Sequence, residues 1–378
     1  MRRARVVIAG GGFAALEAAL ALRALAKEQV ALSLVSPNGR FVYRPAATVE
    51  AFDWAPPSTY ALAEIAGDLG ATFHHAPLES VAPHQQSVRL GSGVSLEYDF
   101  LILAIGARAS SGVPGALVFR DQRDLSHLRT VLEQLASGGI TRLTIAVPSR
   151  DAWSLPAYEL AFLSAMHAAK HGADARVAVV SAEPAPLAVF GREASRLVSN
   201  LMKERDIAFV SAIPHSVRRD GRLALQFDAP IAADRVVAVP ELRGPRVAGI
   251  PSTWSGFVPT DSLGRVEGLS HAYAAGDITT YPIKQGGIAA QQADAVAHTI
   301  AGELGAQIKE LRQTRILRAR LLHGEGALVL RTELDPLGRP TGATIEHRDS
   351  RQTADLKVFG QYLTPYLSIY RSRFQGVA

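Results

Sequence analysis

Cysteine is absent from all 378 residues of the chain. Its absence excludes disulfide frameworks, thiolate metal sites, cysteine nucleophiles and dithiol redox chemistry. Long apolar runs are also absent, since no window approaches the roughly 20 apolar residues of a membrane-spanning helix. The apolar stretch Val6 to Ala26 follows two arginines but is interrupted by Gly10–Gly12 and by charged residues. We therefore do not expect a secretory leader there.

Charge of one sign is not concentrated enough to indicate a nucleic-acid partner. The chain carries 40 Lys and Arg against 35 Asp and Glu, a net charge of +5, and the cations are scattered. A short basic cluster from Arg312 to Arg320 is interpreted as the solvated face of a helix; contact with an anionic partner or lipid surface is the alternative. The histidines lack metal-ligand spacing, so no metal is expected.

The chain opens with a predicted β-α-β unit. Arg5–Ala9 is expected to be a buried strand, an Ala- and Leu-rich helix runs to about Lys27, and Val30–Val35 is the next strand. The turn between the first strand and the helix has the spacing Gly-x-Gly-x-x-Ala of the dinucleotide fingerprint. The predicted cofactor contacts in this turn are Gly10, Gly12, Phe13, Ala14 and Ala15.

Each small residue of this turn has a physical purpose. Gly10 permits the tight turn, Gly12 lets a pyrophosphate approach the backbone, and Ala15 lets the helix pack closely on the strand. The helix then presents free N–H groups and its positive dipole end to the phosphates. One element departs from the fingerprint, because the second strand ends at Ser36 rather than at Asp or Glu. A hydroxyl binds ribose more weakly than a carboxylate does.

Two later segments repeat the pattern of a strand that ends in small residues. One strand leads into Ala104 and Gly106, and another leads into Gly276 and Asp277, followed by a helix from Gly286 through Ala297. Together the three segments resemble the two-dinucleotide-binding-domain flavoproteins. The resemblance implies FAD as cofactor, with Asp277 on its ribitol and the helix N-terminus toward the flavin. The further FAD contacts it implies are Ser36, Arg44, Ala104, Gly106, Gly276, Lys284, Gln285 and Gly286.

Within these flavoproteins the chain resembles the branch of sulfide:quinone oxidoreductase, flavocytochrome c sulfide dehydrogenase and type II NADH dehydrogenase. The segments that carry this resemblance are 36–45, 156–159, 256–261 and 284–294. The C-terminal segment 362–367 is similar to bacterial FAD-dependent oxidoreductases of unassigned substrate. The resemblance covers nearly the whole chain and is weakest over about 300 to 360.

Candidate catalytic residues follow from this branch. Lys284 adds a cation beside the flavin, although a surface lysine is the alternative. Sulfide oxidation in the branch uses a cysteine pair, which this chain lacks, and Trp153 falls near one of those positions. We expect Trp153 to contact substrate or wall the flavin pocket; packing between domains is the alternative. Glu159 is a candidate proton acceptor, or only the acid of a helix N-terminus, and Tyr158 is a candidate for the pocket rim.

A second Rossmann-like unit is predicted from strand Arg142–Val147, a helix over about Pro156 to His171, and strand Val177–Val180. Its first turn, 148–156, contains no glycine, and the next strand ends without a carboxylate. Side chains and prolines thus occupy the place where a pyrophosphate must touch backbone. We expect this unit to keep its fold and to have lost its nucleotide.

The predicted fold is α/β, with two Rossmann-like domains and a small C-terminal α+β domain. The FAD domain is discontinuous, residues 1–112 and 241–302; the inserted NAD-binding-like domain is 113–240 and the C-terminal interface domain 303–378. Residues 328–333 and 341–346 are expected to form a hairpin. The tail from Leu356 to Phe374 has apolar residues at helical spacing, with a kink or break at Pro365.

The sequence thus favours an FAD-dependent oxidoreductase that passes electrons from a small-molecule donor to quinone, oxygen or another acceptor without a redox disulfide. One alternative is an NAD(P)H:quinone oxidoreductase, and another is a flavin-bearing binding or assembly subunit without catalysis. We expect a cytoplasmic protein. The C-terminal tail packs on its own core, touches the inner face of the membrane, or forms a homodimer contact; these three interpretations stay open.

Overall fold

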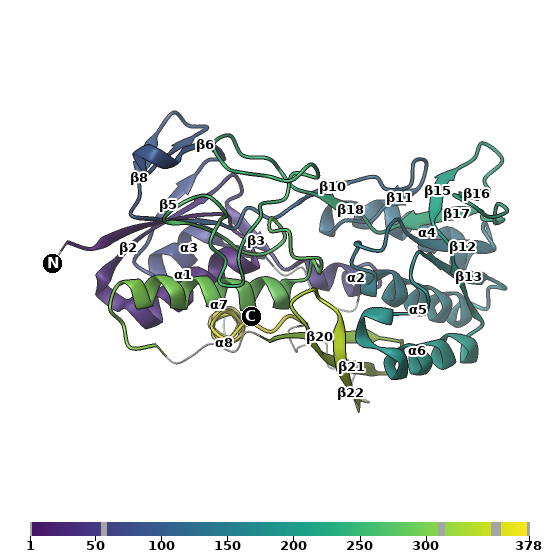
Figure 1. The fold of residues 1–378 in the computed structure, drawn as a ribbon. Coiled ribbons are helices and arrows are strands. Elements are labelled where there is room, and N and C mark those ends of the chain that lie inside the picture. Colours follow the sequence, from purple (N-terminus) through teal and green to yellow (C-terminus); the bar gives the residue numbers. More distant parts are fainter. Residues whose placement is uncertain (1, 54–58, 309–313, 349–356, 376–378) are drawn as a thin grey trace.

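The computed structural model describes residues 2–53, 59–308, 314–348 and 357–375. The chain forms two α/β lobes, and a C-terminal sheet and helix lie against them (Figure 1). Each lobe is built on a five-stranded sheet whose strands are all parallel. Two parallel sheets covered by helices are the expected α/β architecture of two Rossmann-like units.

The first lobe is centred on a sheet with strand order β19-β9-β1-β2-β5. Its strands are β1 (Ala4–Ala9), β2 (Val30–Ser36), β5 (Thr72–His75), β9 (Phe100–Leu103) and β19 (Ala272–Ala274). Because β19 returns from far along the chain, the sheet is assembled from two separate parts of the sequence. The carboxyl ends of β1, β9 and β19 meet at one edge, which brings Gly10, Ala104 and Gly276 together.

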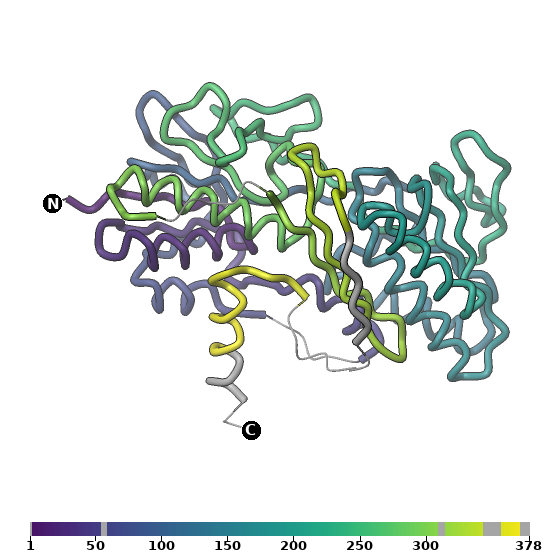
Figure 2. The backbone as a smooth tube through the Cα atoms, turned by 60° about the horizontal axis from the view of Figure 1, so that its bottom comes forward, coloured from purple at the N-terminus to yellow at the C-terminus, as the bar shows by residue number. Residues whose placement is uncertain are grey.

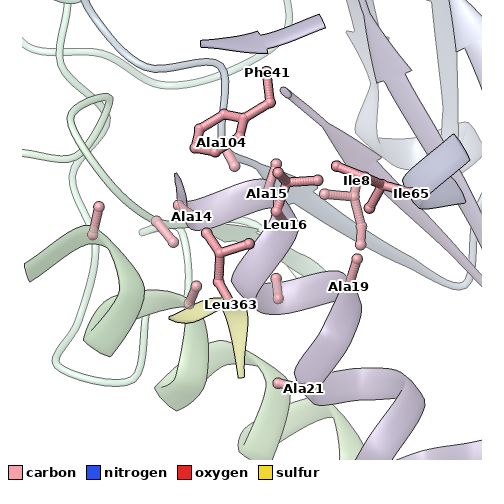
Figure 3. Close-up of a cluster of buried hydrophobic side chains, with 14 of the residues drawn as sticks. Ile8, Ala14, Ala15, Leu16, Ala19, Ala21, Phe41, Ile65, Ala104 and Leu363 are labelled. Atoms are coloured by element: carbon pink, nitrogen blue, oxygen red, sulfur yellow. The ribbon is translucent and has the colours of Figure 1, made fainter. Parts of the chain in front are cut away.

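Helices α1 (Phe13–Ala26) and α7 (Gly286–Glu303) pack against each other on one face of this sheet. The buried face of α1 is mostly alanine, and Figure 3 shows Ala14, Ala15 and Ala19 among Ile8, Leu16 and Leu363. Small side chains let the two helices approach closely, so their N-termini lie near one another at the same edge of the sheet. α7 continues beyond the expected end at Ala297.

Smaller elements complete the first lobe. The sheet β6-β7-β8 and the hairpin β3-β4 are antiparallel. Their bounds, with those of the adjacent helices, are β3 (Arg40–Val42), α2 (Ala47–Glu50), β4 (Thr59–Ala61), α3 (Leu62–Asp68), β6 (Leu78–Ala82), β7 (Ser87–Leu90) and β8 (Ser95–Glu97). Short 3₁₀ turns lie at Lys27–Gln29, Arg44–Ala46, Pro83–Gln85, Gln122–Asp124 and Ala188–Phe190.

The chain leaves the first lobe through β10 (Arg108–Ser110) and returns through β18 (Glu241–Arg243), which pair antiparallel. The second lobe between them has strand order β11-β17-β12-β13-β14. Its elements are β11 (Leu117–Val118), α4 (Leu125–Ala136), β12 (Arg142–Val147), α5 (Leu155–Lys170), β13 (Arg176–Ser181), α6 (Arg192–Glu204), β14 (Ile207–Ser211), β15 (Pro214–Val217), β16 (Leu223–Leu225) and β17 (Arg235–Ala238). The domain boundaries given above stay predictions.

The C-terminal part forms an antiparallel sheet of β20 (Arg315–Leu322), β21 (Ala327–Leu334) and β22 (Pro340–Arg348). The expected hairpin is present as β21 and β22. The prediction of a helix face over Arg312–Arg320 is wrong for the described part of this segment, because residues from Arg315 onward form a strand. Leu317, Ala319 and Leu321 are all buried, and this period of two belongs to a strand with one face in the core. Arg312 and residue 313 lie outside the described residues.

Helix α8 (Leu363–Gln375) ends the described chain and runs outward from the first lobe (Figure 2). Pro365 neither kinks nor breaks it, because Pro365 lies in the first turn, where the backbone N–H has no intrahelical partner. Leu363 and Leu367 are buried against the first lobe, and the hydroxyl of Tyr366 donates to Asp68 at 2.7 Å. Within the described residues, no helix combines the length and apolar character needed to cross a membrane.

Candidate functional site

The turn after β1 can be made only with glycine at its first position. Gly10 has φ +141°, and a Cβ there would overlap the carbonyl oxygen of Ala104 at the end of β9. The Gly10 N–H donates to the Val35 carbonyl at 2.7 Å, which fixes the turn between the neighbouring strands. The loop is thus held by the backbone of β1, β2 and β9 rather than by side chains.

Beyond this turn the backbone is open. A Cβ on Gly12 would meet no atom within 4 Å, and no side chain caps the N-terminus of α1. The ring of Phe13 points away and packs edge-on against Phe41, with 5.1 Å between ring centroids. The N–H groups of Phe13, Ala14 and Ala15 precede the first helical hydrogen bond, which runs from the Leu16 N–H to the Gly12 carbonyl. At the positive end of the helix dipole they form a place where phosphate can bind.

Ser36 lies beneath the same loop. Its side chain is buried, and Oγ accepts a hydrogen bond from the N–H of Asn38 at 3.2 Å. A Cβ on Gly11 would come within 2.8 Å of this oxygen. The hydroxyl therefore stabilises the turn after β2, and it keeps capacity for a further weak hydrogen bond.

The second glycine turn follows β19 and presents Asp277. Gly276 has φ +82°, and its N–H donates at 2.7 Å to the side-chain oxygen of Gln292 on α7. The half-buried carboxylate of Asp277 makes no hydrogen bond or ion pair with any described residue. Burial raises its pKa, while Lys284 and Arg44 act in the opposite direction. A partly buried carboxylate without a partner is costly, and its oxygens can accept hydrogen bonds from a ligand.

Lys284 lies beside that carboxylate. Its Nζ donates to the Thr279 carbonyl oxygen and lies 3.9 Å from the centroid of the Phe257 ring. Burial lowers the pKa of Lys284 to about 8, and the carboxylates of Asp277 and Asp151 oppose this shift. The ammonium therefore faces the unpaired carboxylate, and its charge changes close to physiological pH.

The other predicted cofactor contacts lie around this edge with different partners. The side chain of Gln285 caps α7, accepting from the Ile288 N–H at 3.0 Å, so it is already engaged. Gly286 is covered by Val358 and Phe13. Arg44 is largely exposed and lies 3.5 Å from Asp121. Ala104 and Gly106 follow β9, and a Cβ on Gly106 would meet only open space.

Glu159 does not lie free in the site. Its side chain is 2% exposed, and its carboxylate is 2.8 Å from Lys357 Nζ. It also accepts from the Thr48 hydroxyl at 2.8 Å and from the Leu322 N–H at 3.2 Å. These contacts tie α5 to α2, β20 and the C-terminal segment, and they favour a structural role over that of proton acceptor.

Tyr158 and Trp153 belong to the second lobe, and both have partners there. The hydroxyl of Tyr158 donates to Glu183 at 2.8 Å, and burial beside this carboxylate raises the Tyr158 pKa. Trp153 is partly buried, with 6.2 Å between its ring centroid and that of Phe190. The structure thus places the two aromatic side chains in the packing of the second lobe.

Glu183 is a buried carboxylate two residues after the end of β13. It accepts from Ser154 Oγ at 3.0 Å, from Ser181 Oγ at 3.0 Å and from Tyr158. Arg150, on the turn after β12, donates to the Ala182 carbonyl at 3.2 Å. Groups of the lobe itself therefore hold the Glu183 carboxylate and the turn after β12. Glu183 was not recognised from the sequence because it lies two residues beyond the end of the strand.

A buried carboxyl pair, which the sequence did not indicate, lies between α1 and α7. Glu17 is fully buried and accepts from the N–H groups of Tyr362 and Leu363, at 2.8 and 2.7 Å, so it caps α8. A Cβ on Gly360 would overlap this carboxylate. Asp294 is buried beside Glu17, and burial together with that neighbouring charge raises the Asp294 pKa to about 8.

Asp294→Asn is expected to stabilise the protein above neutral pH. Asp294 is protonated when folded and ionised when unfolded between about pH 4 and pH 8, so wild-type stability falls as pH rises through this window. The variant keeps a neutral side chain, and we expect a gain of roughly 2 kcal/mol in unfolding free energy at pH 9. Urea unfolding at pH 5 and pH 9 measures it, with exposed Asp174→Asn as control. Equal pH dependence in variant and wild type would contradict the proton assignment.

The described residues contain no cluster of three or more His, Cys, Asp or Glu side chains suited to a metal ion. What the first lobe offers instead is an open helix N-terminus, an unpaired carboxylate and an ammonium at one sheet edge. This donor set fits a ligand with a pyrophosphate and several hydroxyl groups.

Comparison with protein families assigns this architecture. The family model described as pyridine nucleotide-disulphide oxidoreductase matches residues 4–147 and 157–295, which is more than half of the chain. The chain belongs to this family. It is accordingly an oxidoreductase of this family, as the sequence predicted, and the family implies a flavin cofactor.

Individual relatives of the family agree. A sulfide-quinone reductase of Aquifex aeolicus (strain VF5) is 27% identical over 220 residues, which are 55% of this chain and 50% of the relative. The match thus spans about half the length of that protein. The structure of the sulfide:quinone oxidoreductase from Aquifex aeolicus has a TM-score of 0.81 at 20% identity and covers 99% of this chain and 91% of its own.

A ferredoxin reductase of the CYP199A2 system from Rhodopseudomonas palustris has a TM-score of 0.68 at 19% identity, covering 87% of this chain and 82% of its own. At these identities the two structural matches show the fold alone. The predicted likeness to the sulfide:quinone oxidoreductase branch is confirmed by the family model and the curated relative together.

Proposed function

We propose that this chain is an FAD-dependent oxidoreductase that takes electrons from a small-molecule donor other than NAD(P)H and uses no redox disulfide. The observation that carries the cofactor assignment is the unpaired Asp277 carboxylate, set beside Lys284 at the edge where Gly12 leaves the backbone open. When bound, FAD supplies two-electron chemistry, accepting electrons from the donor and passing them on.

The chain's own groups have separable tasks toward that cofactor. The N–H groups at the start of α1 would bind the pyrophosphate, and Gly12 would allow its approach. Asp277 would accept hydrogen bonds from the ribitol hydroxyls. Lys284 and the N-terminus of α7 would stabilise negative charge, because a cation and a helix dipole both act favourably there. Ser36 would make only a weak contact with the adenosine ribose.

The donor is proposed from what the second lobe has lost. Its turn has no glycine, Arg150 reaches across to Ala182, and Glu183 already accepts from three hydroxyl groups. A nicotinamide nucleotide would have to displace all of these contacts, and each buried group so exposed would lose its partner. Since cysteine is also absent, a sulfide donor acting through a disulfide has no thiol to use.

The acceptor is proposed from the relatives. The curated relative and the solved structure from Aquifex aeolicus both carry quinone in their names, so a quinone is the acceptor we favour, with oxygen as the other small acceptor. We place the protein in the cytoplasm. The exposed Ile369 on α8 leaves a membrane or dimer contact of the C-terminal segment as part of the same proposal.

NADH and NADPH are expected not to reduce the protein's flavin within seconds. The purified, FAD-supplemented protein is titrated anaerobically with each nucleotide while the oxidised-flavin absorption bands are followed. Dithionite serves as the control that shows the flavin is reducible. Rapid bleaching by either nucleotide would mean that the second lobe still binds it, which favours an NAD(P)H:quinone oxidoreductase. A folded sample without flavin bands would refute the cofactor assignment itself.

The alternative of a flavin-bearing subunit without catalysis predicts a different result for the same sample. Dithionite-reduced protein is exposed first to a soluble quinone and then to oxygen. We expect reoxidation by the quinone. Reduced protein that reacts with neither acceptor would favour the non-catalytic alternative.

A further inference from the structure

Lys284 is held in place by two groups of its own chain. The Thr279 carbonyl oxygen accepts one hydrogen bond from Nζ, and the Phe257 ring lies 3.9 Å below the same nitrogen. An ammonium has three N–H donors, and its charge is attracted to the face of an aromatic ring. No other hydrogen bond or ion pair joins Lys284 to the described residues, so part of its donor capacity is left for a ligand.

The ring itself is fixed relative to the Asp277 turn. The Phe257 N–H donates to Thr253 Oγ1 at 3.2 Å, and its carbonyl accepts from the Thr253 N–H at 2.8 Å. The next residue, Val258, donates to the carbonyl of Ile278 at 2.9 Å. Because Ile278 directly follows Asp277, ring, ammonium and carboxylate belong to one hydrogen-bonded unit.

Charged groups face Lys284 from two further directions. Asp277 lies on the segment between β19 and α7, and Asp151 lies on the turn after β12 in the second lobe. Asp151 is exposed, whereas Asp277 is half-buried. Both carboxylates favour the ammonium, and burial opposes it. The ring attracts the ammonium without adding a third anion, so it does not compete with the negative charge that the site would stabilise.

We propose that Phe257 is a positioning residue for Lys284. The Phe257 ring keeps the Lys284 ammonium charged and directed at the Asp277 edge of the cofactor site. This inference rests on the proposed function, because the group that Lys284 serves is the bound FAD. The face of the ring is what matters, so tyrosine should replace it and an aliphatic side chain of similar size should not.

The chain has only six lysines, so the NMR signal of one of them can be assigned and the proposal can be measured directly. Purified holoprotein is reductively methylated with ¹³C-formaldehyde, and the Lys284 signal is assigned by its loss in Lys284→Arg. Its NMR shift is then titrated with pH in wild type, Phe257→Leu and Phe257→Tyr. We expect the inflection, near pH 8 in wild type, to fall by about half to one pH unit in Phe257→Leu and to stay within about 0.3 unit in Phe257→Tyr.

The flavin midpoint potential as a function of pH is the second readout, since a merely structural ring would not change it. In Phe257→Leu the bend in this profile should move to lower pH together with the NMR inflection. An unmoved inflection would overturn the proposal, and Phe257→Met replaces the leucine variant if that protein does not fold. A moved inflection with an unchanged potential profile would refute the role toward flavin. The lysine titration needs no activity, so it still decides the ring contact if the proposed function fails.

Discussion

Asp277→Ala protein is expected to purify with little or no flavin. The wild-type carboxylate has no partner among the described residues, and hydrogen bonds to a charged acceptor contribute more than neutral ones. Losing the hydrogen bonds to this carboxylate should weaken FAD binding roughly ten- to hundred-fold. The measurement is the ratio of flavin to protein absorbance after purification, followed by FAD titration of the stripped protein.

Two companion variants make this result specific. Asp277→Asn keeps an acceptor without the charge and should bind FAD with intermediate affinity. Asp261→Ala removes a carboxylate that is about half exposed in a neighbouring segment and should retain full flavin. Asp277→Ala protein that still carries a full complement of flavin would refute the assignment of this carboxylate to the cofactor.

The stability of the flavin-free proteins gives an independent check. A half-buried, unpaired carboxylate destabilises the folded state when no ligand satisfies it, which is the usual cost of a binding site. Flavin-free Asp277→Ala should therefore unfold at a urea concentration no lower than flavin-free wild type. A large loss of stability would instead identify Asp277 as a structural residue.

Removing either partner of the Glu159–Lys357 ion pair is expected to lower the free energy of unfolding more than any other substitution proposed for this protein. Glu159 is 1% exposed, its carboxylate lies 2.8 Å from Nζ, and the Lys357 side chain is 11% exposed. Breaking a buried pair leaves one charge uncompensated, which costs about 3–5 kcal/mol. Lys357→Met and Glu159→Gln should each show this loss in urea unfolding, and the double variant should recover much of it.

The double-mutant cycle needs a reference, and the chain provides one. Arg89 and Glu79 form an ion pair at 3.5 Å in which the two side chains are 59% and 58% exposed. Replacing Arg89 by Met should cost under about 1 kcal/mol, because solvent screens exposed pairs. Single variants of Glu159 and Lys357 that cost no more than this reference would show that the buried pair does not form in solution.

The same pair should also control how long the flavin stays bound. Val358 follows Lys357, lies against Gly286 at the start of α7, and donates its N–H to the Tyr43 hydroxyl at 2.8 Å. The C-terminal segment therefore lies against the N-terminus of α7 at the cofactor edge. Lys357→Met should release FAD faster than wild type, as measured by flavin fluorescence after dilution.

Local pattern was sufficient for the elements that are built from neighbouring residues. The strands β1, β2, β12 and β13 lie within one residue of their predicted bounds, because short apolar runs between turns have few other structures available. Gly10 was recognised for the right reason, since its positive φ and the nearby Ala104 carbonyl admit no side chain. The hairpin of β21 and β22 was likewise visible from its turn residues.

The pattern of apolar and charged residues was ambiguous where it is compatible with both a helix and a strand. The basic segment up to Arg320 was interpreted as a helix face, yet its described part is β20, whose pairing with β21 fixes a period of two. Pro365 was expected to interrupt a helix and instead lies in the first turn of α8. In both cases the deciding factor is where the element begins, and this depends on what it packs against.

The sequence by itself determined that this chain is a two-lobed α/β oxidoreductase without thiol chemistry, because the glycine turns and the missing cysteines are local facts. Only the tertiary structure decided which polar side chains remain available for a ligand. Glu159 meets Lys357, Glu183 meets Tyr158, and Gln285 caps its own helix, whereas Asp277 is left unpaired. A carboxylate far along the chain finds or misses its partner only when folding brings the two together in a buried place.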